Sequence, residues 1–296
     1  MMDADDFLGS DDLVEQVDSE VKRVSDLFRF LLKYKEQFQA SGIEFSDLRE
    51  YQTSDDASRI DWKNSAKSPD LYVKEYEEEK DMDVFIVLDA SDTMMFGTAD
   101  KLKSEYCAIM TAALAYASVD AGMNVGFGIF GEDELVITPD GGNSQYQKVL
   151  HEVTKFENHG GQFDLEDALD STIGQIKENT AVFIISDFLN VDHNWKSKMT
   201  VASKKFRHVL SIMVRDPRDH KLPESGNIRF QSVDGDQMVV NTSKVEDEFE
   251  EEALEQEEKI ESQVKNGGGA FLKLETTKEF SAAFAEYFEG EGGGNW

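Results

Sequence analysis

The sequence predicts an α/β fold with a doubly wound, mostly parallel sheet, on three observations. Two apolar runs, residues 84–88 and 181–186, have the length of strands that are buried on both faces. Segments with helical spacing of apolar residues alternate with such runs. Both runs are closely followed by an aspartate, Asp89 and Asp187. Because ligands of open α/β sheets bind beyond the carboxyl ends of the strands, a site is expected there.

The chain begins with a predicted amphipathic helix, which we assign to residues 1–40. Between Asp11 and Phe38, apolar residues recur at helical spacing with charged residues between them. Residues 41–80 mix charged, aromatic and turn residues. We therefore expect an extended, irregular segment that packs on the domain that follows.

Residues 81–288 are predicted to form that domain, because strand and helix patterns alternate along them. Besides the strand that ends on Asp89, we expect strands at 125–130, 134–138, 181–186, 209–214 and 271–274, and helices at 99–121, 144–156, 164–177, 194–206 and 277–288. A small insertion is expected at about 215–266. It comprises a β-hairpin, predicted from a Val-Asp-Gly-Asp turn between two short strands, and an acidic helix. Residues 289–296 are a predicted flexible tail.

The charge balance restricts the class of partner. Thirty Lys and Arg residues face sixty-one Asp and Glu residues, which gives a net charge of −31. Such a chain repels nucleic acid and anionic membrane surfaces, so a nucleic-acid reader is excluded. The excess is spread along the chain and is typical of a halophilic archaeon, because concentrated salt screens self-repulsion. An ordinary acidic protein is the alternative.

The cysteine content and the lack of targeting segments indicate where in the cell the protein is located. Cys107 is the single cysteine, so no intramolecular disulfide and no thiolate metal site can form. The acidic N-terminus lacks the pattern of a signal peptide, and no segment has the roughly 18 consecutive apolar residues of a membrane span. We therefore expect a cytoplasmic protein without a membrane span.

A candidate ion site follows the first buried strand. Asp89, Ser91 and Thr93 supply one carboxylate and two hydroxyls at alternate positions, and Mg²⁺ prefers such oxygen ligands. The alternative is that these side chains only satisfy turn amides or cap the next helix. The pattern also differs from the phosphotransferase nucleophile motif Asp-x-Asp-x-Thr, because Ser91 stands where the second carboxylate is needed.

A longer block of residues carries a resemblance to a known family. Its pattern is Glu-Phe-x-x-Leu-Arg-x-Tyr followed by Asp-Asp-x-x-Arg-x-Ile-Asp-Trp-x-x-Ser-Ala-Arg/Lys. The matching residues are Glu44, Phe45, Leu48, Arg49, Tyr51, Asp55, Asp56, Arg59, Ile60, Asp61, Trp62, Ser65, Ala66 and Lys67. With these residues the chain resembles the domain-of-unknown-function 58 (DUF58) family, which carries a von Willebrand factor A-like domain. We interpret the block as a structural tie to the sheet, with a binding surface as the alternative.

The resemblance implies a Rossmann-like fold and a metal-ion-dependent adhesion site (MIDAS). Asp89 and Ser91 match the first loop of that site, and Thr93 replaces its final Ser while keeping the hydroxyl. Asp187 matches the third loop. These four residues are therefore our candidate ligands for Mg²⁺ or Mn²⁺.

The second loop of the adhesion site departs from the family pattern Gly-Gly-Thr-Asp-Leu. Here Gly160 and Gly161 are followed by Gln162, Phe163 and Asp164, so one residue is inserted and the Thr is missing. The carbonyl oxygen of Gln162 and a water held by Asp164 could replace the Thr, whereas Phe163 could close the site.

The resemblance also implies a function. Proteins similar to this one are paired with MoxR-type AAA+ ATPases, so we expect a non-enzymatic interaction or adaptor protein. It would help that ATPase to remodel, assemble or insert metal into client proteins. The alternatives are a metal-dependent hydrolase that uses Asp89 and Asp187, and a structural scaffold that binds no ion.

Overall fold

The computed structural model describes most of the chain. The described residues are 45–52, 65, 71–76, 82–191, 193–223, 226–231, 237–242 and 245–291. Two compact units are distinguished, one of residues Leu32–Asp81 and one of Met1–Leu31 with Met82–Trp296. The predicted N-terminal helix lies outside the described residues, as does most of the family-specific block.

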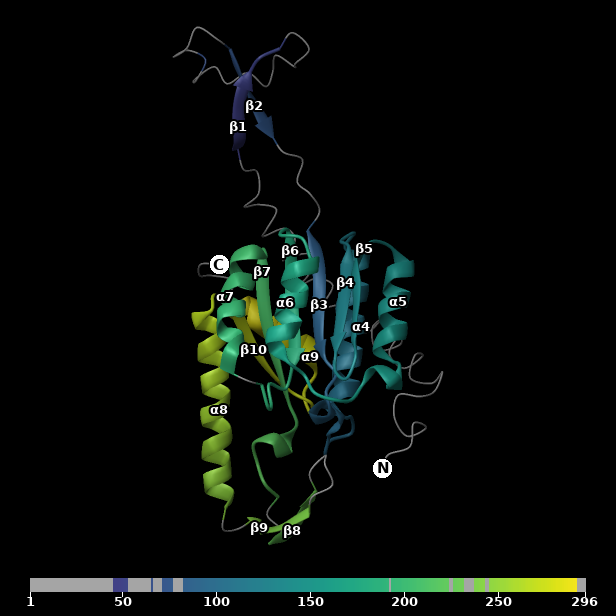
Figure 1. The fold of residues 1–296 in the computed structure, drawn as a ribbon, viewed down its shortest axis with the longest axis vertical. Helices are drawn as coiled ribbons and strands as arrows, with labels where there is room; N and C mark the ends of the chain where they lie inside the picture. The colour runs from purple at the N-terminus through teal and green to yellow at the C-terminus, as the bar shows by residue number, and fades with distance from the viewer. Residues whose placement is uncertain are drawn as a thin grey trace. The chain divides into compact units, whose positions relative to one another are not determined.

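A six-stranded sheet forms the centre of the larger unit (Figure 1). Its order is β10-β7-β6-β3-β4-β5. The strands are β3 (Asp83–Asp89), β4 (Val125–Phe130), β5 (Glu134–Asp140), β6 (Thr180–Ser186), β7 (His208–Arg215) and β10 (Ala270–Glu275). All neighbouring strands are parallel except β5, which pairs antiparallel with β4 at one edge. The sheet confirms the predicted α/β class and is mostly parallel, as predicted.

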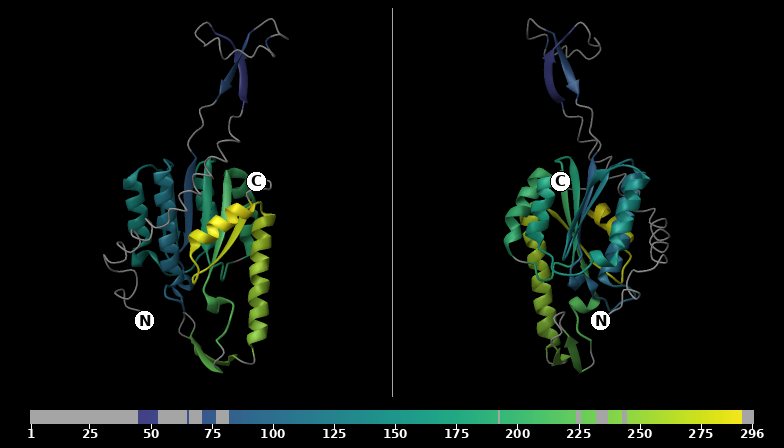
Figure 2. Two further views of the ribbon diagram at one scale, coloured as in Figure 1. Left: turned by 180° about the vertical axis from the view of Figure 1, so that it is seen from behind. Right: turned by 45° about the vertical axis from the view of Figure 1, so that its right-hand side comes forward.

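Helices cover both faces of the sheet, which is therefore doubly wound. They are α4 (Lys103–Asp120), α5 (Asn143–Val153), α6 (Leu165–Gln175), α7 (Lys196–Lys205), α8 (Glu246–Asn266) and α9 (Phe280–Glu291). Figures 1 and 2 show α6 and α7 on one face and α4 and α9 on the other. One core cluster joins alternate residues of β3, such as Phe85 and Val87, to residues of α6, α7 and α8. The alternation follows from the pleat of a strand.

Helix α4 is apolar on nearly all sides and is buried along most of its length, as its sequence predicts.

The predicted β-hairpin and acidic helix are both present, between β7 and β10. Strands β8 (Asn227–Gln231) and β9 (Gln237–Asn241) form an antiparallel hairpin, and α8 follows. Ile260 and Val264 of α8 are buried, whereas most of its acidic residues are exposed. Helix α9 extends to Glu291, so the predicted flexible tail begins within a helix, and residues 292–296 lie outside the described part.

The smaller unit corrects one expectation. Residues 41–80 were expected to be irregular, but β1 (Phe45–Glu50) and β2 (Tyr72–Tyr76) pair as antiparallel strands. The backbone N–H of Tyr51 extends this pairing by donating to the carbonyl of Leu71 at 2.8 Å. Neither strand shows a clean alternation of apolar and polar residues, so the pairing left no periodic signal.

Candidate functional site

The predicted side chains of Asp89, Ser91 and Thr93 lie together at the carboxyl end of β3, whose last residue is Asp89. The backbone N–H and the hydroxyl of Ser91 both donate to Oδ1 of Asp89, at 2.9 and 2.6 Å. The hydroxyls of Ser91 and Thr93 are 3.1 Å apart and share a hydrogen bond. The carboxylate of Asp89 thus accepts a turn amide, as the alternative interpretation predicts, and the three oxygen-bearing side chains form one connected chain.

Asp89 is also bonded to the neighbouring strand. The hydroxyl of Ser186, the last residue of β6, donates to Oδ2 of Asp89 at 2.6 Å. The Asp89 side chain is buried, with 2% of the residue exposed. Burial, followed by the negative charge of Asp187, raises the pKa of Asp89 to about 7, although hydrogen bonds from Ser186 and Ser91 oppose the change. The surroundings of Asp89 therefore favour its neutral form more strongly than water does.

Asp187 follows β6 and is fully buried. Its Oδ1 accepts the backbone N–H of Leu189 at 2.8 Å. Its Oδ2 accepts a hydrogen bond from the ammonium nitrogen of Lys103, also at 2.8 Å. Phe188 and Asn190 have positive φ angles of 54° and 58°, a left-handed conformation that non-glycine residues rarely adopt. The loop after β6 is thus a tight turn that fixes the direction of the Asp187 carboxylate.

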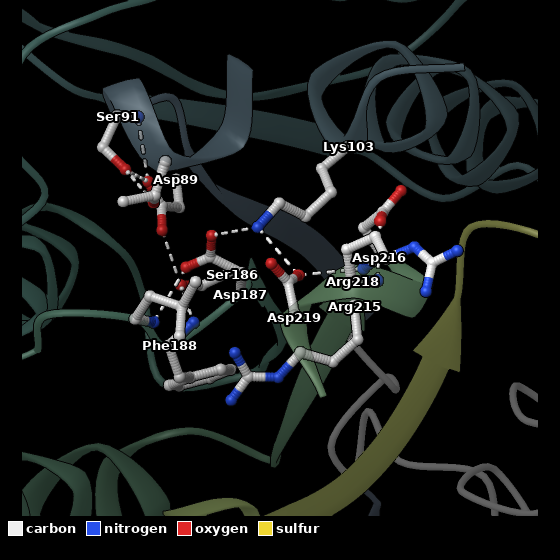
Figure 3. Close-up of polar contacts among 12 residues, drawn as sticks. Asp89, Ser91, Lys103, Ser186, Asp187, Phe188, Arg215, Asp216, Arg218 and Asp219 are labelled. Carbon is white, nitrogen blue, oxygen red and sulfur yellow. Dashed lines mark hydrogen bonds and ion pairs between the residues drawn. The ribbon is translucent and has the colours of Figure 1, made fainter. Parts of the chain in front are cut away.

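Lys103 was not among the predicted site residues, yet it lies at the centre of the cluster (Figure 3). It is the first residue of α4 and its side chain is fully buried. The ammonium also contacts Oδ2 of Asp219 at 2.9 Å. Burial alone would lower the pKa of Lys103, but the charges of Asp187 and Asp219 outweigh it and raise that pKa. The lysine is therefore a buried cation.

The loop after β7 supplies Asp219 through a short 3-10 turn, Pro217–Asp219. Asp216 caps this turn by accepting the backbone N–H of Arg218, while Asp219 accepts the backbone N–H of Asp216. Asp216 also accepts the backbone N–H and the hydroxyl of Thr98, at 2.7 and 2.5 Å. Burial would raise the pKa of Asp216, but these hydrogen bonds lower it. Two loops far apart in sequence are thereby joined.

The glycine pair of the second loop packs against the loop after β3. Gly160 donates its N–H to the carbonyl of Ala90 at 2.6 Å, and Asp92 donates its N–H to the carbonyl of Gly161 at 3.0 Å. Gly131, just after β4, approaches so closely that an added Cβ would lie 2.5 Å from the Gly160 carbonyl oxygen. Glycine is needed here because backbone meets backbone.

The three residues after the glycine pair have separate positions. Gln162 is exposed, and Phe163 is buried in the core cluster. Asp164 caps α6, because its Oδ1 accepts the backbone N–H groups of Glu166 and Asp167. The Asp164 carboxylate is therefore engaged with the start of a helix.

The arrangement does not fit a divalent ion at Asp187. Both oxygens of this carboxylate already accept hydrogen bonds, and one donor is an ammonium 2.8 Å away, which would repel a metal cation. Within the described ranges, no group of three or more His, Cys, Asp or Glu residues is placed to hold a metal ion. Binding of Mg²⁺ or Mn²⁺ by Asp89, Ser91, Thr93 and Asp187 stays a prediction of the family resemblance, and the Lys103 ammonium opposes it at Asp187.

In the described part of the chain, no helix combines the length and the apolar character that crossing a bilayer requires.

Two relatives of known sequence are described as uncharacterized. The chain is 26% identical over 253 residues to an uncharacterized protein of Mycobacterium tuberculosis, covering 83% of this chain and 78% of the relative. An uncharacterized protein of Mycobacterium bovis matches with the same values.

Solved structures with a similar fold include the conserved hypothetical protein BatB from Bacteroides thetaiotaomicron, with a TM-score of 0.48 and 16% identity. An aerotolerance-related membrane protein from Bacteroides fragilis has a TM-score of 0.46 and 16% identity. Each match covers 71% of this chain and 98% of the other chain. The family model described as "Protein of unknown function DUF58" matches residues 47–259. This match extends over more than half of the chain, which therefore belongs to the DUF58 family.

Proposed function

We propose that this chain is a non-enzymatic adaptor that binds protein partners at the carboxyl end of its sheet. One observation carries the proposal: the carboxylates of Asp89 and Asp187 are buried and bonded to donors of the chain itself. A hydrolase built on these two residues would need them to face a substrate. The adaptor needs only the surface that the surrounding loops form.

Phe96 is our candidate contact residue on that surface. It follows the short helix after β3, and 43% of its surface is exposed. Its ring lies 5.7 Å from the ammonium of Lys103, measured to the ring centroid. Exposed aromatic side chains often contribute a large share of binding energy in protein interfaces. Phe96 thus joins the buried cluster to the surface.

The family resemblance supplies the partner in this proposal, a MoxR-type AAA+ ATPase together with its client. The adaptor would help the ATPase to remodel, assemble or insert metal into that client. An ATPase partner requires ATP, so we include a cytoplasmic location in the proposal. A scaffold that needs no ion is compatible with this role, because the Lys103 to Asp187 ion pair balances charge without a metal.

The test is the affinity of the full chain for the purified MoxR-type ATPase of the same organism, compared between wild type, Phe96→Ser and Val201→Ser. Val201 lies on α7 and has a similar exposure of 47%, so it is the matched control. We expect binding by wild type and V201S and a loss of about ten-fold or more in F96S. Absence of binding by wild type contradicts the proposal. Turnover of a phosphate or peptide substrate that Asp89→Ala abolishes would establish the hydrolase instead.

A further inference from the structure

We propose that the ammonium of Lys103 is the built-in cation of the carboxyl-end site and takes, at Asp187, the part that a divalent ion would take in an adhesion site of this fold. The charge that organises the loops then belongs to the chain itself. The inference concerns ion binding and does not depend on the adaptor role.

The position of Lys103 is the first support. Its ammonium lies between two carboxylates that follow neighbouring parallel strands, Asp187 after β6 and Asp219 after β7 (Figure 3). The distances are 2.8 and 2.9 Å. A cation that joins loops at the carboxyl ends of adjacent strands does what a metal ion does when several loops supply its ligands.

The second support is that the partners of the ammonium are fixed in advance. Leu189 donates its N–H to Oδ1 of Asp187, which leaves Oδ2 toward the ammonium. Asp216 donates its N–H to the same Oδ2 of Asp219 that contacts Lys103. A buried ion pair is favourable only with good geometry and additional hydrogen bonds, and both conditions are met here.

Burial is the third support. The side chains of Lys103 and Asp187 are fully buried, and that of Asp219 is 6% exposed. A lysine is almost never fully buried unless its ammonium is paired, because transfer of an unpaired ammonium out of water costs much free energy. Two carboxylates and the nearby face of the Phe96 ring replace the lost water.

A divalent ion and the ammonium would compete for the same carboxylate. An ion that used Asp187 would have to displace the hydrogen bond of Lys103 or lie beside a like charge. Removing the charge of Lys103 should therefore open the site to a metal. One consequence rests on the proposed function: a partner of this chain would need no carboxylate to complete the coordination of an ion.

The experiment is a calorimetric titration of the full chain with Mn²⁺ alone, up to about 1 mM, a concentration that occupies weak oxygen sites substantially. Wild type, Lys103→Arg, Lys103→Met and the double variant Lys103→Met/Asp187→Asn are compared. We expect no saturable binding by wild type or K103R, which keep the cation. K103M should gain one Mn²⁺ site, and the double variant should lose it.

Thermal unfolding is the second readout. The melting temperature of wild type should be the same in Mn²⁺ and in EDTA, whereas K103M should melt lower in EDTA and recover in Mn²⁺. Saturable 1:1 binding by wild type that Asp89→Ala abolishes would overturn the proposal, as would a folded K103M that gains no Mn²⁺ site. If K103M does not fold in either buffer, K103R decides, and a gain of Mn²⁺ binding by K103R overturns the proposal. Failure of the adaptor role would appear in partner binding and not in these titrations.

Discussion

The ammonium nitrogen of Lys103 lies 2.8 Å from Oδ2 of Asp187, and both side chains are fully buried. The pair joins the start of α4 to the loop after β6. Asp219 extends it to the loop after β7. Three segments at the carboxyl end of the sheet are thus held by one internal cation, and the consequences can be measured.

Replacing Lys103 by Met should strongly destabilise the fold, because it leaves Asp187 and Asp219 buried without a counter-charge. Loss of one partner of a buried pair lowers the free energy of unfolding by about 3–5 kcal/mol. Urea unfolding measures this change. Lys198→Met is the matched control, since Lys198 pairs with Asp170 at the surface and such exposed pairs contribute little to stability. Equal effects of the two substitutions would contradict the central role of the buried pair.

Replacing Gly131 by Ala should separate the second loop from the loop after β4. The added Cβ would meet the Gly160 carbonyl oxygen at 2.5 Å, and such overpacking lowers the free energy of unfolding by about 1–3 kcal/mol. Gly174→Ala is the control, because Gly174 lies in α6 with open space around its Cβ position. G174A should be neutral or stabilising by up to about 1 kcal/mol. A G131A variant as stable as wild type would refute the close approach.

His208 should make stability depend on pH. Burial lowers the pKa of His208 from 6.5 to about 4, so the folded state keeps this side chain neutral while the unfolded state takes up a proton. Stability is therefore lost as the pH falls below about 6.5, by about 1–2 kcal/mol between pH 7 and pH 5. Over this range, the free energy of unfolding of wild type should fall by this amount relative to that of His208→Gln. His151→Gln is the control, because His151 is exposed. If the free energy of unfolding depends on pH in the same way for H208Q and wild type, the prediction is contradicted.

Replacing Thr98 by Val should weaken the link between the loop before α4 and the loop after β7. The substitution removes the hydroxyl that donates to Asp216 at 2.5 Å, which should lower the free energy of unfolding by about 1–3 kcal/mol. It should also raise the pKa of Asp216, because hydrogen bonds from Thr98 keep that pKa low. The native carboxylate contributes stability above the unfolded pKa, and this is lost as the pH falls through the folded pKa. NMR titration of the Asp216 carboxyl carbon reports the shift.

Thr200→Val is the control for that variant. The Thr200 hydroxyl donates only within α7, to the carbonyl of Lys196, so T200V should change stability by a few tenths of a kcal/mol. If T98V and T200V lower the free energy of unfolding equally, the hydrogen bond between Thr98 and Asp216 contributes no more to stability than one within a helix.

Much of the fold follows from sequence periodicity. The buried strands β3 and β6 are continuous apolar runs, and the helices between strands carry the spacing that predicts them. The aspartates at both strand ends were found because they interrupt these runs. The pairing of β1 with β2 was missed, since about twenty residues separate the strands and their side chains do not alternate.

The cation of the site was missed for a different reason. Lys103 lies in a segment with an apolar helical pattern, and its partner Asp219 is 116 residues away in sequence. Only the packing of α4 on the sheet brings the two together. The paired acids Asp216 and Asp219 around Pro217 were a signal, because acids at this spacing often cap a turn. That signal predicts a turn, but it does not predict that Asp219 pairs with Lys103.

A crystal structure of the wild-type chain grown in excess Mn²⁺, with anomalous data, tests the central claim most directly. We expect no anomalous peak beside Asp187, and we expect the Lys103 ammonium within hydrogen-bond distance of Asp187 and Asp219. A Mn²⁺ peak bonded to Ser91, Thr93 or Asp187, with the Lys103 side chain turned away, would contradict the account.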